Sequence, residues 1–72
     1  MTTFFEWITT DQLIGLVLMA SERASQWERV IKSLEDKGAT QEAINKAVGH
    51  RDGILVAELM LLQELERRLD AI

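Results

Sequence analysis

The chain of 72 residues contains no cysteine, no proline and no tyrosine, and its single histidine is His50. Without cysteine it has neither disulfides nor thiolate metal sites, and one histidine does not build a zinc site. Small chains usually need such a cross-link, a metal or a partner chain, because a core of this size supplies only about 3–5 kcal/mol. We therefore expect no metal and no cofactor, and we expect oligomerisation to supply the missing stability.

Positive charge is also scarce, because eight Lys and Arg residues face twelve Asp and Glu residues, for a net charge of −4. A negative net charge opposes non-specific electrostatic attraction to nucleic acid and to an anionic membrane surface. The longest apolar run, residues 13–20, is far shorter than the roughly 20 residues that span a bilayer. No basic segment precedes it, so it does not resemble a signal peptide. We expect a soluble cytoplasmic protein.

Groups that perform catalysis are equally sparse. His50 and Asp52 lie two positions apart, a spacing typical of solvated surface rather than of a catalytic dyad. Residues 49–53, GHRDG, lack the Lys-Ser/Thr pair of a phosphate-binding loop, and there is no HExxH motif. We predict no catalytic residue and a protein that is not an enzyme.

The chain does have strong helical patterning. Thr9 and Gln12 have the form of a capping box, and Ile8 and Leu13 occupy the flanking hydrophobic-staple positions. Apolar residues then recur at alternating spacings of four and three, at Leu13, Val17, Ala20, Ala24, Trp27, Ile31 and Leu34. This pattern predicts a long amphipathic helix over about residues 10–37.

A second helix should follow after a short turn. Gly38 is placed as the left-handed residue that ends the first helix, and Thr40 is a candidate N-cap. The alternation then continues at Ile44, Val48, Arg51, Leu55, Glu58, Leu62, Leu65, Leu69 and Ile72. We predict a second helix over about residues 40–71, and hence an all-α, single-domain antiparallel hairpin over residues 1–72.

Two glycines, Gly49 and Gly53, fall inside the second predicted helix. Each costs about 1 kcal/mol relative to alanine in a helix interior. Either they allow another group to approach closely, or they mark a kink. Both interpretations stay open.

Residues 13–20 and 54–62 are apolar on nearly every side of their helices. In a hairpin that turns near residue 39, facing residues have numbers that sum to about 78, so these segments lie side by side. A helix that is apolar all round must be buried on more than one side. We predict a homodimer in the form of a four-helix bundle, with an interface at Leu13, Leu16, Val17, Leu55, Leu59 and Leu62.

Two charged residues interrupt the seam of the second helix. The same rule places Arg51 opposite Trp27, where its guanidinium can make a cation–π contact with the indole. It places Glu58 level with Ala20, with Arg23 as a reachable partner. The alternative is that both charges turn outward at the edge of the seam.

Residues 40–53, TQEAINKAVGHRDG, resemble the helix-turn-helix family of DNA-binding proteins. They match the start of that family's first helix at residues 40–42 and its turn glycine at Gly49. Asn45 and Glu58, however, occupy positions where the family has small or apolar packing residues. The would-be recognition helix also lacks the cluster of basic residues that phosphate contacts need. A degenerate helix-turn-helix regulator is therefore kept as an alternative.

The amino-terminal arm, residues 1–8, holds three of the four aromatic residues. Such side chains are enriched at interface hot spots. They either fold over the open end of the bundle or swap onto the sister chain, or they contact a partner, and different rings can do different things. The candidate partner contacts are Phe4, Phe5, Trp7, His50 and Arg51.

By its size, its capped long hairpin and its wide apolar belts (LIGLVLMA, ILVA and LMLL), the chain resembles small phage-encoded host-takeover proteins. It is similar in particular to the proteins of the anti-quorum-sensing type, which form dimeric helical hairpins. The resemblance covers the full length but rests on no motif, so no functional residue is carried over. It implies an inhibitor in the host cytoplasm that binds a bacterial host protein such as a transcriptional regulator. A structural or chaperone-like helical dimer is the other alternative.

Overall fold

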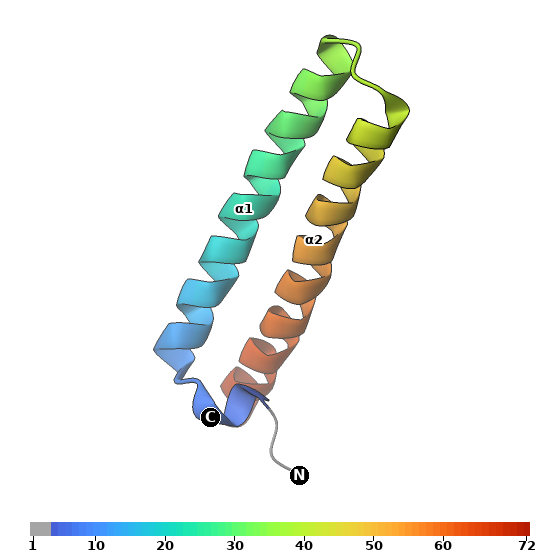
Figure 1. Ribbon diagram of the computed structural model, residues 1–72. Coiled ribbons are helices and arrows are strands. Elements are labelled where there is room, and N and C mark those ends of the chain that lie inside the picture. Colours follow the sequence, from blue (N-terminus) through green and yellow to red (C-terminus); the bar gives the residue numbers. More distant parts are fainter. Residues whose placement is uncertain (1–3) are drawn as a thin grey trace.

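A computed structural model describes residues 4–72, without the side chain of Phe4, as an all-helical hairpin (Figure 1). A short 3-10 helix, η1 (Phe4–Trp7), precedes two long helices, α1 (Thr10–Asp36) and α2 (Gln41–Asp70). The long helices run antiparallel, and η1 lies beside the C-terminal end of α2, opposite the turn. The predicted hairpin is confirmed, with helix ends within one residue of those expected. Residues 1–3 of the predicted arm lie outside the described residues.

The start of α1 is fixed by the predicted capping box. The Gln12 backbone N–H donates to Thr9 Oγ1 at 3.1 Å, and the Thr9 backbone N–H donates to Gln12 Oε1 at 2.9 Å. These two bonds satisfy amide groups that have no acceptor within the helix. The boundary is therefore set by residues that are neighbours in sequence.

The turn also forms as its residues predict. Gly38 has a φ of +70°, the left-handed conformation that favours glycine. Its N–H donates to the carbonyl of Glu35 at 3.1 Å, and the Ala39 N–H donates to the carbonyl of Leu34 at 2.9 Å. These two bonds form a Schellman motif, which ends α1. The Thr40 hydroxyl then accepts the Ala43 N–H at 3.2 Å and begins α2.

The core between the helices is thin. Only four described residues are buried, namely Leu13, Ala24, Ile31 and Ala47, and two of these are alanines. All seven predicted seam positions of α1 are buried or half-buried, which confirms that half of the seam. One chain by itself therefore buries few large side chains.

The predicted seam of α2 is half-buried at six of its nine positions and was wrong at Leu55, Leu69 and Ile72. Ala47 is buried and Ile54 is half-buried on the inner side of the helix. Leu55 and Leu69 are instead 43% and 56% exposed, and Ile72 lies beyond the helix and is fully exposed. In an α-helix, the residues three and four positions from an inward-facing residue lie on opposite sides of the buried stripe. Because α2 has apolar residues on both sides, its sequence does not show which side faces α1. Packing selected the side that the sequence pattern left undetermined.

The interhelical polar contacts also differ from those expected. The ring that stacks on Trp27 is that of His50, with centroids 4.9 Å apart and an interplanar angle of 8°. Arg51 instead pairs with Glu28 of α1 at 3.0 Å, so the predicted cation–π contact was wrong. Glu58 directs Oε2 into the seam, where it is buried and has no hydrogen-bond partner among the described residues. Arg23, the reachable partner, forms no bond to it within the described residues.

Gly49 and Gly53 neither break α2 nor admit another group within one chain. The helix runs through both residues from Gln41 to Asp70. A Cβ added at either glycine would meet no atom within 4 Å. The turn that a helix-turn-helix requires at Gly49 is therefore missing from the described chain.

The hairpin is elongated and exposes much surface for its mass. Its extents are 50 × 22 × 17 Å, and its radius of gyration is 15.6 Å, against about 11 Å for a compact chain of this length. Its accessible surface is 5571 Å², roughly 1,000 Å² more than a compact monomer of 8.2 kDa exposes. A single copy thus leaves unburied an area comparable to that of a protein interface.

Candidate interaction surfaces

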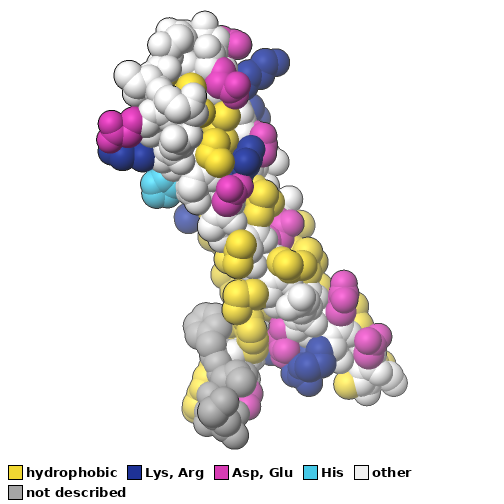
Figure 2. All heavy atoms as spheres, turned by 90° about the vertical axis from the view of Figure 1, so that its right-hand side faces the viewer, with side chains coloured by type: hydrophobic (Ala, Val, Ile, Leu, Met, Phe, Trp, Pro, Cys, Tyr) yellow, Lys and Arg dark blue, Asp and Glu magenta, His cyan; other side chains and the backbone are white. Residues whose placement is uncertain are grey.

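Exposed hydrophobic side chains gather in the half of the hairpin away from the turn. Ten of the eleven large ones lie there, at Trp7, Ile14, Leu18, Met19, Leu55, Val56, Leu59, Met60, Leu69 and Ile72. Figure 2 views the molecule from the side that carries α2. Hydrophobic side chains form a band down its middle and lower parts, and charged groups gather near the turn and at the far end.

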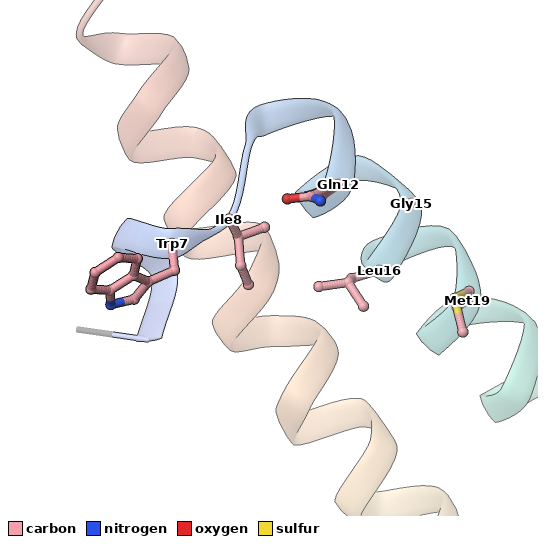
Figure 3. Close-up of a pocket in the computed structure, with 6 residues that line it drawn as sticks. All are labelled: Trp7, Ile8, Gln12, Gly15, Leu16 and Met19. Carbon is pink, nitrogen blue, oxygen red and sulfur yellow. The ribbon is translucent and has the colours of Figure 1, made fainter.

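One face of this region is hollowed. Three shallow depressions share Leu16 and form what we call the Leu16 groove. Its lining consists of Phe5, Trp7, Ile8, Gln12, Gly15, Leu16, Met19, Ala20, Arg23, Ile54, Ala57, Met60 and Leu61. The small side chains of Ala20 and Ala57, together with Gly15, leave the space that makes this face concave. In Figure 3, Ile8 and Leu16 point toward one another, whereas the ring of Trp7 is turned away from them.

The groove lining is distinctive in its charge. Arg23 is its only charged residue, and no carboxylate lines it. The chain as a whole carries twelve carboxylate side chains and only eight Lys and Arg. The concave face is therefore apolar with one positive charge at its turn-proximal end.

The opposite face carries a second apolar surface, which we call the Leu18 strip and define by Ile14, Leu18, Leu55 and Leu59. Gln12 lines the groove and Leu13 is fully buried, so Ile14, one position further round α1, lies on the other face. In the same way Ala57 lines the groove and Glu58 points inward, which places Leu59 opposite the groove. The four strip residues are between 41% and 65% exposed.

The amino-terminal segment is held over the open end of the hairpin by Arg68. Its guanidinium donates to the carbonyl of Phe5, to Thr10 Oγ1 at 3.4 Å and to Glu64 Oε1 at 3.1 Å. Phe5 itself is half-buried and lines the groove. Packing of the arm on its own chain, one of the two interpretations of the aromatics, thus applies to Phe5.

Glu64 accepts hydrogen bonds from two neighbouring arginines, Arg67 and Arg68. Hydrogen bonds from Arg67, at 2.8 and 2.6 Å, and then from Arg68 lower the pKa of Glu64 to about 2, against the opposing effect of burial. The same bonds raise the pKa of Arg67. Near the turn, hydrogen bonding to Asp52 raises the pKa of Arg51, with a smaller contribution from Glu28.

The five candidate partner contacts do not form one site. Trp7 is 80% exposed at the open end, and Phe5 is half-buried in the lining of the groove. The side chain of Phe4 lies outside the described residues. His50 and Arg51 lie nearer the turn, in the stack on Trp27 and the pairs with Glu28 and Asp52. The Arg51 side chain is 25% exposed. Among the Phe and Trp side chains that the structure describes, Trp7 is the most exposed.

The six predicted dimer contacts divide in a similar way. Leu13 is fully buried within its own chain, so it offers no surface to a second copy. Val17 and Leu62 are half-buried, Leu16 is central to the groove, and Leu55 and Leu59 lie on the strip.

Sequence reasoning missed the groove residues Met19, Ala57 and Met60. The sequence signal for these residues was the presence of two long methionines and a small alanine at positions outside the main heptad stripe.

Comparisons with known proteins add no assignment, because the chain matches no family model, no curated protein and no solved structure. Among residues 4–72, no three His, Asp or Glu side chains come together to hold a metal ion. Over the same residues, no helix combines the length and the apolarity that crossing a membrane requires. The two apolar faces are thus the features on which a functional proposal rests.

Proposed function

We propose that the protein is a non-enzymatic protein–protein interaction module that works as a homodimer. In this dimer the Leu16 grooves of two copies pack together and form a four-helix bundle. The observation that carries the proposal is the surface excess of roughly 1,000 Å² per chain. A standard interface takes about 800 Å² from each partner, so one partner of ordinary size accounts for the excess.

The charge distribution favours the groove as the face where copies meet. Two copies of an acidic chain repel one another wherever their carboxylates are brought close. The groove lining has no carboxylate, so this cost is smallest there. Its flexible Met19 and Met60 side chains suit the filling of an irregular apolar space. Of the predicted contacts, this arrangement keeps Leu16 and leaves Leu55 and Leu59 free for another role.

The dimer is tested with two neighbouring substitutions on opposite faces of α1. Met19, in the groove, is 51% exposed, and Leu18, on the strip, is 65% exposed. We expect the unaltered protein to have a mass near twice 8.2 kDa by light scattering at micromolar concentration. Met19→Arg should give the monomer mass, because it places two like charges in the interface, and Leu18→Arg should remain dimeric. A monomeric unaltered protein, or dissociation by Leu18→Arg alone, overturns the proposal.

The finer proposal is that the dimer inhibits a bacterial host protein, such as a transcriptional regulator. What supports it is the architectural resemblance to phage-encoded anti-quorum-sensing hairpins, together with the strip that remains exposed after dimerisation. Affinity capture from bacterial lysate tests it: one host protein retained at stoichiometric ratio, and inhibited when the hairpin is added, is the expected result. Salt-sensitive retention of DNA would favour the regulator alternative instead, and retention of neither would favour a structural or chaperone-like dimer.

A further inference from the structure

We propose that the two copies of the dimer pack antiparallel through their Leu16 grooves, so that the Trp7 end of each groove meets the Arg23 end of the other. This inference rests on the proposed dimer, and it adds the orientation of the copies and the residues that each contributes to the other. The groove of one copy is then completed by η1 of the second copy. The reasons are the order of residues along α1 and the shape of the groove.

One stripe of α1 forms a wall of the groove. Gln12, Leu16, Met19 and Arg23 line it at spacings of four, three and four, so they lie on one side of the helix. All three depressions share Leu16 and two share Met19, so the middle of the groove lies between these two residues. The stripe therefore has an apolar centre and one polar side chain at each end.

This stripe is complementary to itself when two copies run in opposite directions. About a centre between Leu16 and Met19, facing residues of the two α1 helices have numbers that sum to about 35. Leu16 of each copy then faces Met19 of the other, and Gln12 faces Arg23. The side-chain oxygen of Gln12 accepts one bond from the Thr9 N–H, and its second lone pair is available to the guanidinium of the other copy.

The shape of the groove favours the same orientation. At the open end, η1 adds bulk to this face, and Trp7 is 80% exposed there. The turn-proximal end is instead hollow, because its lining includes the small side chains of Ala20 and Ala57. In an antiparallel pair, each raised end enters a hollow end. In a parallel pair, the two raised ends would collide and the two hollows would face one another, which leaves unfilled space.

The distribution of apolar surface also fits an overlap of the open halves alone. Antiparallel packing about the groove centre brings these halves together and leaves the turn-proximal halves in solvent. In the turn-proximal half, Val30 is the one large exposed hydrophobic side chain among the described residues. A parallel pair would bring the turn-proximal halves together as well, and would gain little apolar contact there.

Charge is compatible with both orientations, so shape decides between them. Arg23 lies beside carboxylates of its own chain, namely Glu22, the preceding residue, and Glu58, whose Oε2 is turned into the seam. The interacting charges around η1 are two carboxylates and two guanidinium groups, namely Glu6, Glu64, Arg67 and Arg68. Neither end of the groove therefore has an excess charge that would keep the other end away.

A distance between the two copies tests the orientation. The chain has no cysteine, so Ser33→Cys carries a single nitroxide label at an exposed position nearer the turn. Residue 33 lies about 23 Å along the axis from the proposed centre, so antiparallel copies hold their labels about 45 Å apart or more. In a parallel pair the labels lie level, and the width of the bundle keeps them within about 30 Å. Pulsed electron–electron double resonance on the labelled dimer measures this distance.

Variants then test whether the raised end enters the hollow end, with dimer affinity measured by analytical ultracentrifugation. Ala57→Phe fills the hollow and should weaken the dimer at least tenfold. Val56→Phe is the matched control, because Val56 is 60% exposed and lines none of the three depressions, and it should leave the affinity unchanged.

Trp7→Ala should weaken the dimer as well, but in the Ala57→Phe background it should cost little more. In one chain, Trp7 and Ala57 line depressions at opposite ends of the groove. Non-additive effects of the two substitutions therefore report a contact between copies.

Three results overturn the inference. Labels within about 30 Å in a dimer would show a parallel pair. Additive effects of Trp7→Ala and Ala57→Phe would eliminate the docking of the raised end, and equal weakening by Val56→Phe would place the interface elsewhere on α2. A dimer with labels within about 30 Å leaves the proposed dimeric module standing, whereas a monomeric unaltered protein refutes the module itself.

Discussion

At the scale of single residues, we expect replacement of the two glycines of α2 by alanine to stabilise the protein. Gly49 and Gly53 are helical, and a Cβ at either would enter open space. Replacement by alanine removes conformational freedom from the unfolded chain without a clash. We expect Gly49→Ala and Gly53→Ala each to raise the free energy of unfolding by about 0.5–1 kcal/mol, measured by urea denaturation.

Gly38 is the control for these substitutions. It also has open space around it, but its φ of +70° is one that side-chain-bearing residues rarely adopt. Gly38→Ala should therefore destabilise the hairpin. If all three alanine variants are destabilised alike, a partner chain or another part of the molecule occupies the space around α2.

A second expectation at this scale concerns pH. The folded-state pKa of Glu64, about 2, lies below its ordinary value of 4.5, because Arg67 and Arg68 bond to the carboxylate. The ionised carboxylate therefore adds its full stabilisation above about pH 4.5. This contribution declines as the pH falls below 4.5 and is lost once the pH passes through about 2.

Glu64→Gln should flatten the acid limb of the stability profile between pH 4.5 and pH 2, followed by circular dichroism during urea unfolding. Glu42→Gln removes an exposed carboxylate near the turn and should leave that limb in place. An unchanged slope in Glu64→Gln would show that other carboxylates govern acid unfolding.

At the scale of elements, hydrogen bonds from Arg68 attach η1 to the hairpin. Arg68 is the residue that joins Phe5, Thr10 and Glu64 by hydrogen bonds. A lysine has no planar fork of donors and does not reproduce three such bonds. We expect Arg68→Lys to raise the hydrogen-exchange rate of the Ile8 amide, which bonds to the Phe5 carbonyl within this segment.

Arg67→Lys is the matched control, because within residues 4–72 the hydrogen bonds of the Arg67 side chain go to Glu64. It should leave the exchange of the Ile8 amide near its original rate. Equal protection in both variants would mean that apolar contacts of the arm, rather than Arg68, hold η1 in place.

The caps of the long helices contribute at the same scale. Thr9→Ala removes the hydrogen bond from the Gln12 backbone N–H and with it half of the capping box, whose other bond runs from the Thr9 backbone N–H to the Gln12 side chain. Thr40→Ala removes the one bond from the Ala43 backbone N–H. Each should lower the free energy of unfolding by about 1 kcal/mol, with the larger loss at Thr9. Threonine-to-serine changes at the same positions keep the hydroxyl and should cost little.

At the scale of the whole molecule, stability should depend on association. With four buried residues in the described part of the chain, two of them alanine, one copy has a core at the lower limit for independent folding. If the second copy completes the core, the folded state gains stability by mass action. We expect the midpoint of thermal unfolding to fall on tenfold dilution, and Met19→Arg to abolish that dependence. A midpoint independent of concentration in the unaltered protein would argue for a monomer.

The parts of the fold that depend on near neighbours in sequence were predictable. The capping box at Thr9 and the left-handed turn at Gly38 each involve residues within five positions of one another. Their residue types alone specify the geometry. The candidate surface was predictable only in outline, because the wide apolar belts indicated excess hydrophobic surface without indicating its two faces.

The sequence by itself determined where the helices begin and end, that they form a hairpin, and that more apolar surface exists than one hairpin can bury. Only the tertiary structure decided the rotation of α2, which set Ile54 inward and Leu55 outward and brought His50 rather than Arg51 onto Trp27. The reason is physical: caps and turns are local bonds, whereas the rotation of a helix that is apolar on several sides is fixed by packing against its neighbour. That rotation also separated the carboxylate-free groove from the Leu18 strip on the opposite face.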